Sequence, residues 1–150
     1  MNEKMDSSVF LKIPLFKDLP KVELYALVNE LPVEQYNAGD YIFHEGEPGN
    51  SLYVVQKGKI DVVLAGGTND EMLLRTCGPG EYVGEMSLIL KQGKRTAAVR
   101  VREDSHLWMM TRDKFNECLQ RWPHLAYAMV EINSKRLDSP NEAAFNVLVI

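Results

Sequence analysis

Apolar and polar residues divide this chain into three parts, with helical patterns at both ends and a β-type pattern between them. From residue 33 to residue 110, short apolar runs alternate with clusters of Gly, Pro, Asn and Asp. Turn signals at such regular spacing are typical of a β-barrel or jelly roll rather than of βαβ units. The expected strands cover residues 41–44, 51–56, 59–65, 71–76, 82–83, 96–102 and 105–110. Gly58 separates two of these runs and predicts a tight hairpin.

The flanking parts show apolar residues that recur on one helical face. Residues 21–31 are expected to form an amphipathic helix. The apolar face of this helix consists of Leu24, Leu27, Val28 and Leu31. Thr111 can cap a helix that runs to residue 119, and a longer helix with Pro123 at its start should end near residue 138. Capping-box spacing at residues 139–142 predicts a final, almost wholly apolar helix.

Composition and charge indicate one ordinary globular domain over residues 1–150, with a frayed tail at residues 1–8. The formal net charge of −4 argues against a nucleic-acid-binding surface, which is usually basic. No apolar run approaches the length of a membrane span and no secretory leader is evident, so we expect a cytoplasmic protein without membrane contact. Cys77 and Cys118 are far apart and are expected to be reduced thiols.

Candidate chemistry is concentrated in residues 84–97, Gly-Glu-Met-Ser-Leu-Ile-Leu-Lys-Gln-Gly-Lys-Arg-Thr-Ala. Gly84 allows a ligand to approach the backbone closely. The next residues can form a helical turn, and the free N–H groups of Met86 and Ser87 would then bind an anion. Arg95 adds a planar set of donors that suits two phosphate oxygens. Glu85 would repel a phosphate, so we expect its carboxylate to accept hydrogen bonds from sugar hydroxyls.

Two other interpretations remain open on these residues alone. Glu85 and Arg95 could form an ion pair across the turn, because short motifs often arise by chance. A β body is also the scaffold of cupin-type metalloenzymes, which need clustered metal ligands. The histidines, His44, His106 and His124, are isolated and form no H-x-H pair. With no metal cluster and no nucleophile–base pair evident, we expect a binding protein and not an enzyme.

The same stretch resembles the phosphate-binding cassette of the cyclic nucleotide-binding domain family. That cassette reads Gly-Glu, a small residue, Leu, variable residues, Arg, a small or hydroxyl residue and Ala. The residues that fill those places are Gly84, Glu85, Ser87, Leu88, Arg95, Thr96 and Ala97. The resemblance extends over residues 14 to about 137, with family-like runs at 14–20, 38–49 and 51–62. It implies a mainly β fold with flanking α, an eight-stranded β-roll with N-terminal helices and two to three C-terminal helices.

This resemblance implies a set of ligand-binding residues and no further cofactor. The set consists of Gly84, Glu85, Met86, Ser87, Arg95, Thr96, Leu74 and Val83. Glu85 would hold the ribose 2′-hydroxyl, while Arg95 and the N–H groups after Glu85 would hold the cyclic phosphate. Thr96 would offer a hydroxyl to the phosphate or the base. The base would lie against Leu74 and Val83.

The ligand implied is cyclic AMP or cyclic GMP. The ten-residue step from Glu85 to Arg95 resembles the bacterial members of the family, so cyclic AMP is favoured. Family members couple binding to movement of their C-terminal helices, which implies a protein partner or an attached effector domain. Residues 122–137 resemble the dimer-forming helix of the family's bacterial transcription regulators, so a homodimer through the C-terminal helices is one option.

Two further hypotheses come from the end of the sequence. Pro140 interrupts the helical pattern and no helix-turn-helix comes after it, so nucleic-acid binding by these 150 residues is not expected. The chain could be the sensor half of a catabolite-activator-like transcription regulator without its DNA-binding part, or a degenerate ligand-free interaction domain. Residues 140–150 would form a lid over the ligand, a self-association seam or the start of a further region.

Overall fold

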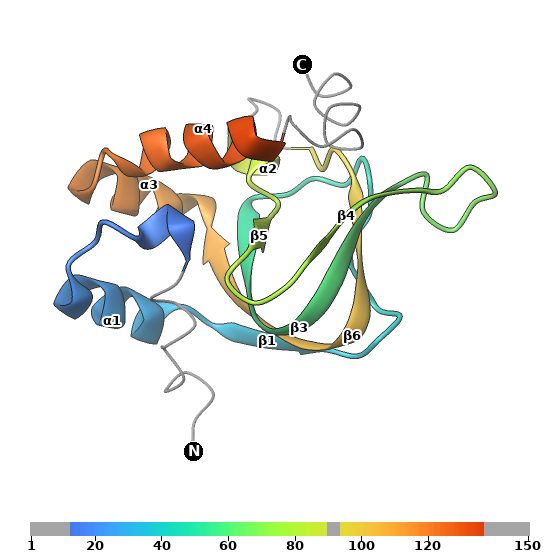
Figure 1. Ribbon diagram of the computed structural model, residues 1–150, viewed down its shortest axis with the longest axis horizontal. Helices are drawn as coiled ribbons and strands as arrows, with labels where there is room; N and C mark the ends of the chain where they lie inside the picture. Colours follow the sequence, from blue (N-terminus) through green and yellow to red (C-terminus); the bar gives the residue numbers. More distant parts are fainter. Residues whose placement is uncertain (1–12, 90–93, 137–150) are drawn as a thin grey trace.

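The computed structural model describes residues 13–89 and 94–136. In chain order, the elements are η3 (Pro14–Phe16), α1 (Lys21–Glu30), β1 (Val33–Tyr36), β2 (Tyr41–Phe43), β3 (Ser51–Leu64), β4 (Met72–Cys77), β5 (Tyr82–Val83), α2 (Met86–Ile89), β6 (Ala98–Thr111), α3 (Arg112–Arg121) and α4 (Leu125–Arg136). Helices η3, α1, α3 and α4 lie together beside one end of the β body (Figure 1). The predicted tail at residues 1–8 and the predicted helix over 140–150 lie outside the described residues.

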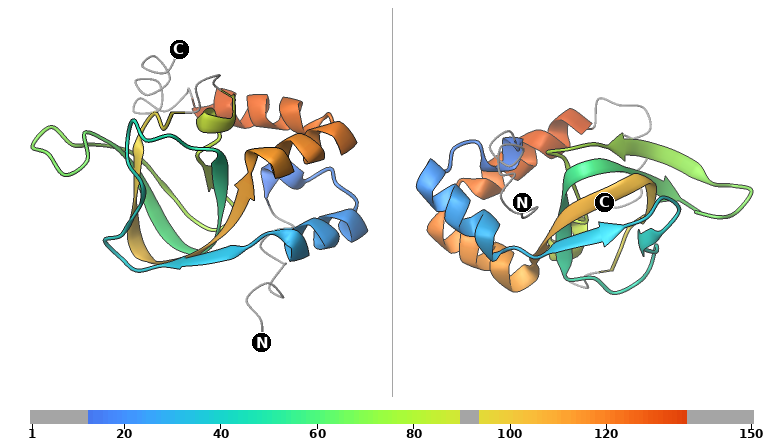
Figure 2. Two further views of the ribbon diagram at one scale, coloured as in Figure 1. Left: turned by 180° about the vertical axis from the view of Figure 1, so that it is seen from behind. Right: turned by 90° about the horizontal axis from the view of Figure 1, so that it is seen from below.

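The strands form one antiparallel sheet around two long central strands. The order is β1-β6-β3-β4, with β2 also paired to β6 and β5 to β3. Strands β3 and β6 are 14 residues each and pair with each other along most of their length. Both bend, so that the sheet curls into a roll (Figures 1 and 2). The predicted mainly β fold with flanking helices is therefore confirmed.

The number of strands differs from the expected eight, and the hairpin predicted at Gly58 is wrong. Among the described residues there are six strands in the sheet. The runs on either side of Gly58 continue as one strand, β3, and the expected strands at 96–102 and 105–110 likewise continue as one strand, β6. Gly58 has φ +98°, and the register with β6 shifts around it. A Cβ there would lie 2.2 Å from Ser105 Oγ and 2.5 Å from Asp104 O. This glycine therefore accommodates a bulge that bends a continuous strand.

The described helix ends agree with the sequence patterns to within two residues. Helix α1 buries Leu24, Leu27 and Val28, as predicted. Helix α3 is capped as predicted, because the Thr111 side chain accepts a hydrogen bond from the backbone N–H of Lys114 at 3.2 Å.

The start of the last described helix was predicted two residues too early. Helix α4 begins at Leu125 rather than at Pro123. The N–H of Trp122 still donates to Cys118 O, at 2.7 Å, so Trp122 belongs to the C-cap of α3. The chain therefore needs a short turn before it can start a new helix.

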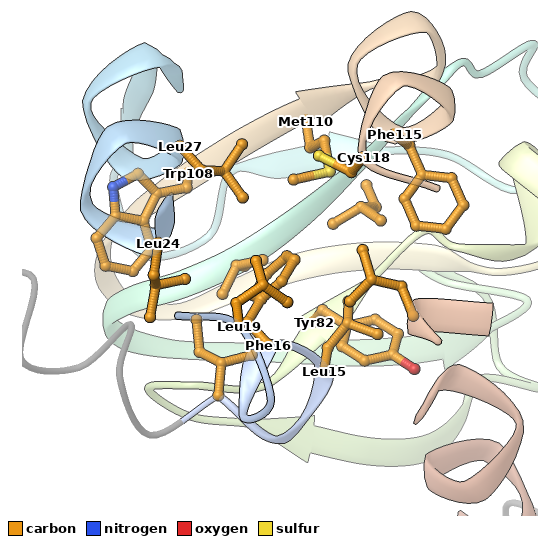
Figure 3. Close-up of a cluster of buried hydrophobic side chains, with 14 of the residues drawn as sticks. Leu15, Phe16, Leu19, Leu24, Leu27, Tyr82, Trp108, Met110, Phe115 and Cys118 are labelled. Atoms are coloured by element: carbon orange, nitrogen blue, oxygen red, sulfur yellow. The ribbon is translucent and has the colours of Figure 1, made fainter. Parts of the chain in front are cut away.

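Two buried apolar clusters share the central strands. The helix-side cluster joins η3, α1, α3 and α4 to one face of the strands (Figure 3). Its members include Leu15, Phe16, Leu19, Leu24, Leu27, Tyr82, Trp108, Met110, Phe115 and Cys118. The roll cluster fills the other face with Phe43, Tyr53, Val55, Ile60, Val62, Leu74, Cys77, Val83, Ala97, Val99, Val101 and Leu107. Successive residues of a strand point to opposite faces, so β3 and β6 contribute to both clusters.

Candidate functional site

A cavity of about 330 Å³, counting the open space at its mouth, lies at the edge of the roll cluster. Its lining combines apolar residues of the roll with polar residues from both sides of α2. The lining residues are Phe43, Val62, Arg75, Val83, Gly84, Glu85, Ser87, Arg95, Thr96, Ala97 and Val99.

The Arg95 side chain is the most strongly held polar group of the cavity. The residue is 6% exposed. Its Nη1 donates to Ser51 O at 2.7 Å, to Ser87 Oγ at 2.8 Å and to Gly84 O at 3.3 Å, and its Nη2 donates to Ser51 Oγ at 3.1 Å. The guanidinium carbon lies 4.0 Å from the centre of the Phe43 ring, a cation–π contact. One end of the guanidinium is therefore fixed by the fold itself.

The other edge of this guanidinium still has hydrogen-bonding capacity. Arg95 Nε is buried and has no hydrogen-bond partner in the described part of the chain. All the acceptors that hold Arg95 there are neutral oxygens, so no carboxylate neutralises it directly. Burial lowers the pKa of the Arg95 guanidinium, and the neighbouring Tyr53, Glu47 and Glu85 partly offset this effect. A buried cation that no carboxylate bonds to directly is unfavourable, so an anion could be accommodated beside it.

Glu85 and Gly84 complete the polar side of the cavity. Glu85 is 4% exposed and lines the same cavity as Arg95. The sequence left a direct Glu85–Arg95 ion pair open, but the ion pairs between described residues do not include one, and Arg95 bonds to Ser51, Gly84 and Ser87. Gly84 has φ +90°, and a Cβ there would lie 2.8 Å from Arg95 Nη1 and 3.0 Å from Ser51 O. Glycine is therefore required for Arg95 to reach its acceptors.

The remaining predicted site residues divide into three groups. Ser87, Thr96 and Val83 line the cavity as expected of binding residues. Leu74 is buried in the roll cluster but is not among the lining residues. Met86 begins α2, and its side chain lies outside the described part of the structure. The ligand contacts assigned to all of these residues stay predictions.

Several residues of the site were missed by sequence reasoning. Ser51 supplies two of the oxygens that hold Arg95 from 44 positions away in sequence. Phe43 stacks under the guanidinium, and Arg75 adds a second cation to the lining. At Gly49 a Cβ would lie 2.2 Å from Arg95 Nε, so this glycine makes room for the side chain. Nothing in the local sequence indicates these contacts, because they depend on how β2 and β3 pack beside residue 95.

Two properties of the described residues bear on the other classes of function. No group of three or more His, Cys, Asp or Glu residues is placed to hold a metal ion within residues 13–89 and 94–136. None of the helices there has both the length and the apolar character needed to cross a bilayer.

Cys77 and Cys118 are free thiols and are buried.

An antiparallel roll whose cavity presents a buried arginine and a buried carboxylate defines a small-ligand-binding domain. The chain belongs to the cyclic nucleotide-binding domain family, whose model, described as "Cyclic nucleotide-binding domain", matches residues 33–121. The family resemblance predicted from sequence is thereby confirmed.

Similar proteins include channels and regulators. The potassium/sodium hyperpolarization-activated cyclic nucleotide-gated channel 2 of Mus musculus is 36% identical over 126 residues, which are 84% of this chain and 14% of the channel. The catabolite activator protein of Thermus thermophilus superposes with TM-score 0.76 at 31% identity, over 89% of this chain and 61% of that one. The regulatory subunit of a cAMP-independent protein kinase A from Trypanosoma brucei has TM-score 0.77 at 22% identity, over 99% and 52% of the two chains, and supports the fold alone. The chain thus spans only a small part of the channels that it matches.

Proposed function

We propose that the cavity binds a cyclic nucleotide, with cyclic AMP favoured over cyclic GMP, and that the domain acts by binding rather than by catalysis. The observation that supports this most directly is the state of Arg95. Among the described residues, it is a buried cation with neutral acceptors at one end and an unused N–H at the other. A phosphate with one negative charge would supply both the missing charge and the missing acceptor.

The rest of the cavity suits the other parts of such a ligand. The Glu85 carboxylate only accepts hydrogen bonds when ionised, so it fits the ribose hydroxyl rather than the phosphate. The apolar side chains of Val62, Val83 and Val99 offer a surface for a flat base. Thr96 adds a hydroxyl to the lining. The ten-residue step from Glu85 to Arg95 resembles the bacterial members of the family, and this resemblance is the reason for favouring cyclic AMP.

The proposed output is a movement of the helices that come after β6. This movement would be transmitted to a partner protein or to an attached domain. Relatives within the family have different activities, since one is an ion channel and another a catabolite activator. The binding step is therefore the shared part of the function, and we assign the domain to sensing. A homodimer through the C-terminal helices is one route for the output.

The test is calorimetric titration of the purified chain with cyclic AMP, cyclic GMP, guanosine and a cyclic dinucleotide. We expect binding of cyclic AMP, and Arg95→Ala should lose about 1.5–3 kcal/mol, which corresponds to about ten- to 150-fold in affinity. Arg100→Ala is the matched control, because Arg100 pairs with Glu71 and does not line the cavity. Wild-type affinity in Arg95→Ala, or no heat with any cyclic nucleotide, would overturn the proposal.

A further inference from the structure

Arg112 connects the cavity to the helices that come after the β body. It is the first residue of α3 and lies directly after β6. Its backbone N–H donates to Asn50 O at 2.6 Å. Its side-chain Nη2 donates to Ser87 O, on α2, at 2.5 Å. One residue therefore joins the start of α3 to two separate segments of the β body.

Both of those segments also hold Arg95. Asn50 precedes Ser51, whose carbonyl and hydroxyl oxygens accept from Arg95. Ser87 accepts from Arg95 through its hydroxyl and from Arg112 through its carbonyl. Arg95 is thus connected to the first turn of α3 by two routes of hydrogen bonds and short covalent links, one through Ser51 and Asn50 and one through Ser87.

The Arg95 end of these routes can respond to a ligand. Nη1 has two hydrogens and three acceptors within reach, at Ser51 O, Gly84 O and Ser87 Oγ. An anion that accepts from the unused Nε would pull on the same rigid guanidinium, and so change how Nη1 divides its two hydrogens among these three acceptors. Ser87 belongs to the four-residue helix α2. Its hydroxyl accepts from Arg95 and its carbonyl from Arg112, so a movement of Ser87 that follows Arg95 also alters its bond to Arg112.

A displacement of the first turn of α3 can be transmitted to α4. Phe115 and Cys118 of α3 pack in the helix-side cluster together with Leu125 and Met129 of α4 (Figure 3 shows the α3 residues). Close-packed interiors transmit small shifts rather than absorbing them. Helix α4 lies against η3 and comes after α3 with a short turn between them (Figure 1).

We propose that Arg112 is the positioning residue that couples occupancy of the Arg95 cavity to helices α3 and α4. This inference rests on the proposed function, since it needs a ligand that binds Arg95. The Arg112 side chain can be removed by substitution without removing the backbone hydrogen bond of this residue. The backbone bond to Asn50 O extends the β3–β6 pairing at Ser51 and Thr111 and does not depend on the side chain.

The experiment compares four versions of the full chain: wild type, Arg112→Ala, Arg112→Lys and the control Arg121→Ala. Arg121 has the same charge on the same helix, but its contact is with Glu23 of α1. Circular dichroism verifies folding, calorimetry gives the affinity for cyclic AMP and cyclic GMP, and hydrogen exchange of residues 112–136 is measured with and without saturating nucleotide. A purely structural role would alter exchange equally in both states, so the nucleotide-dependent difference is the diagnostic quantity.

We expect the nucleotide to change exchange over residues 112–136 in the wild type and in Arg121→Ala. In Arg112→Ala the affinity should stay within about tenfold of wild type, while less than half of the exchange difference remains. Arg112→Lys, which keeps a charged donor, should restore part of it. A full exchange difference in both Arg112 variants, or a wild type that binds without any change in these helices, would overturn the coupling alone. A wild type that binds no nucleotide would overturn the proposed function and the coupling with it.

Discussion

Replacement of Gly49 by alanine would test the placement of Arg95 without changing Arg95. A Cβ on Gly49 would lie 2.2 Å from Arg95 Nε, 2.4 Å from Cζ and 2.9 Å from Cδ. Ordinary carbon contacts are about 3.5–4.0 Å, so the guanidinium would have to move by at least about 1 Å. Gly49 is not among the glycines with positive φ, so alanine adds no backbone strain there. The substitution therefore acts on the position of Arg95.

Two opposing effects determine the stability of Gly49→Ala. Displacement breaks the hydrogen bonds of Arg95 to Ser51 and Ser87, each worth about 1 kcal/mol net. It also releases a buried cation that no carboxylate of the described residues pairs with directly, and this relief is worth several kcal/mol. We expect the unfolding free energy to change by no more than about 1 kcal/mol. Binding has no such compensation, because the charge-assisted contacts with the phosphate, about 1.5–3 kcal/mol, are lost.

Urea unfolding and calorimetry on the same preparations measure both quantities. The control is Gly78→Ala, because a Cβ on Gly78 meets nothing within 4 Å and its φ is not positive. We expect Gly49→Ala to fold like the wild type and to bind cyclic AMP about ten- to 150-fold more weakly, with Gly78→Ala unchanged in both respects. A Gly49→Ala protein with wild-type affinity would refute the assignment of Arg95 to the phosphate.

Two further predictions concern carboxylates. Glu85→Gln should weaken cyclic AMP binding by about tenfold and leave 2′-deoxy cyclic AMP unaffected; equal losses for both nucleotides would contradict the ribose contact. The bidentate hydrogen bonds from Arg100 lower the pKa of Glu71 to about 2. The pair therefore stabilises the fold above the ordinary carboxyl pKa of about 4.3, and this contribution fades as the pH falls towards 2. Urea unfolding of wild type and Glu71→Gln should differ at pH 6 and converge near pH 2, whereas a constant difference would rule the pair out.

Local patterns predicted the elements whose formation depends on nearby residues. The spacing of Leu24, Leu27 and Val28 places them on one face of α1, and the structure buries all three. Thr111 caps α3 for a reason visible in the sequence, since the cap and its donor at Lys114 are three residues apart. The convergence of Glu85 and Arg95 on one cavity was also expected, because both belong to a recognisable short motif.

Features that depend on pairing between distant strands were not predictable in the same way. A glycine between two apolar runs indicates a turn and a bulge equally well. At Gly58 the outcome is decided by β6, which pairs with β3 on both sides of the bulge. Ser51 and Gly49 shape the space around Arg95, but nothing in their own neighbourhood reveals that residue 95 will lie beside them. Arg112 is likewise an ordinary helix-starting residue until the position of Ser87 is known.

The two proposals give Arg95 two separable roles. Its Nη1 end is bound to the fold through Ser51 and Ser87, and its Nε edge has no partner in the described residues. A guanidinium held only by the ligand could bind a phosphate without any structural change in the rest of the domain. One held on every side by the fold would have no donor left for a ligand. Because this side chain is held on one side only, Gly49→Ala should reduce affinity while Arg112→Ala should reduce the helix response, so binding and signalling can be separated by experiment.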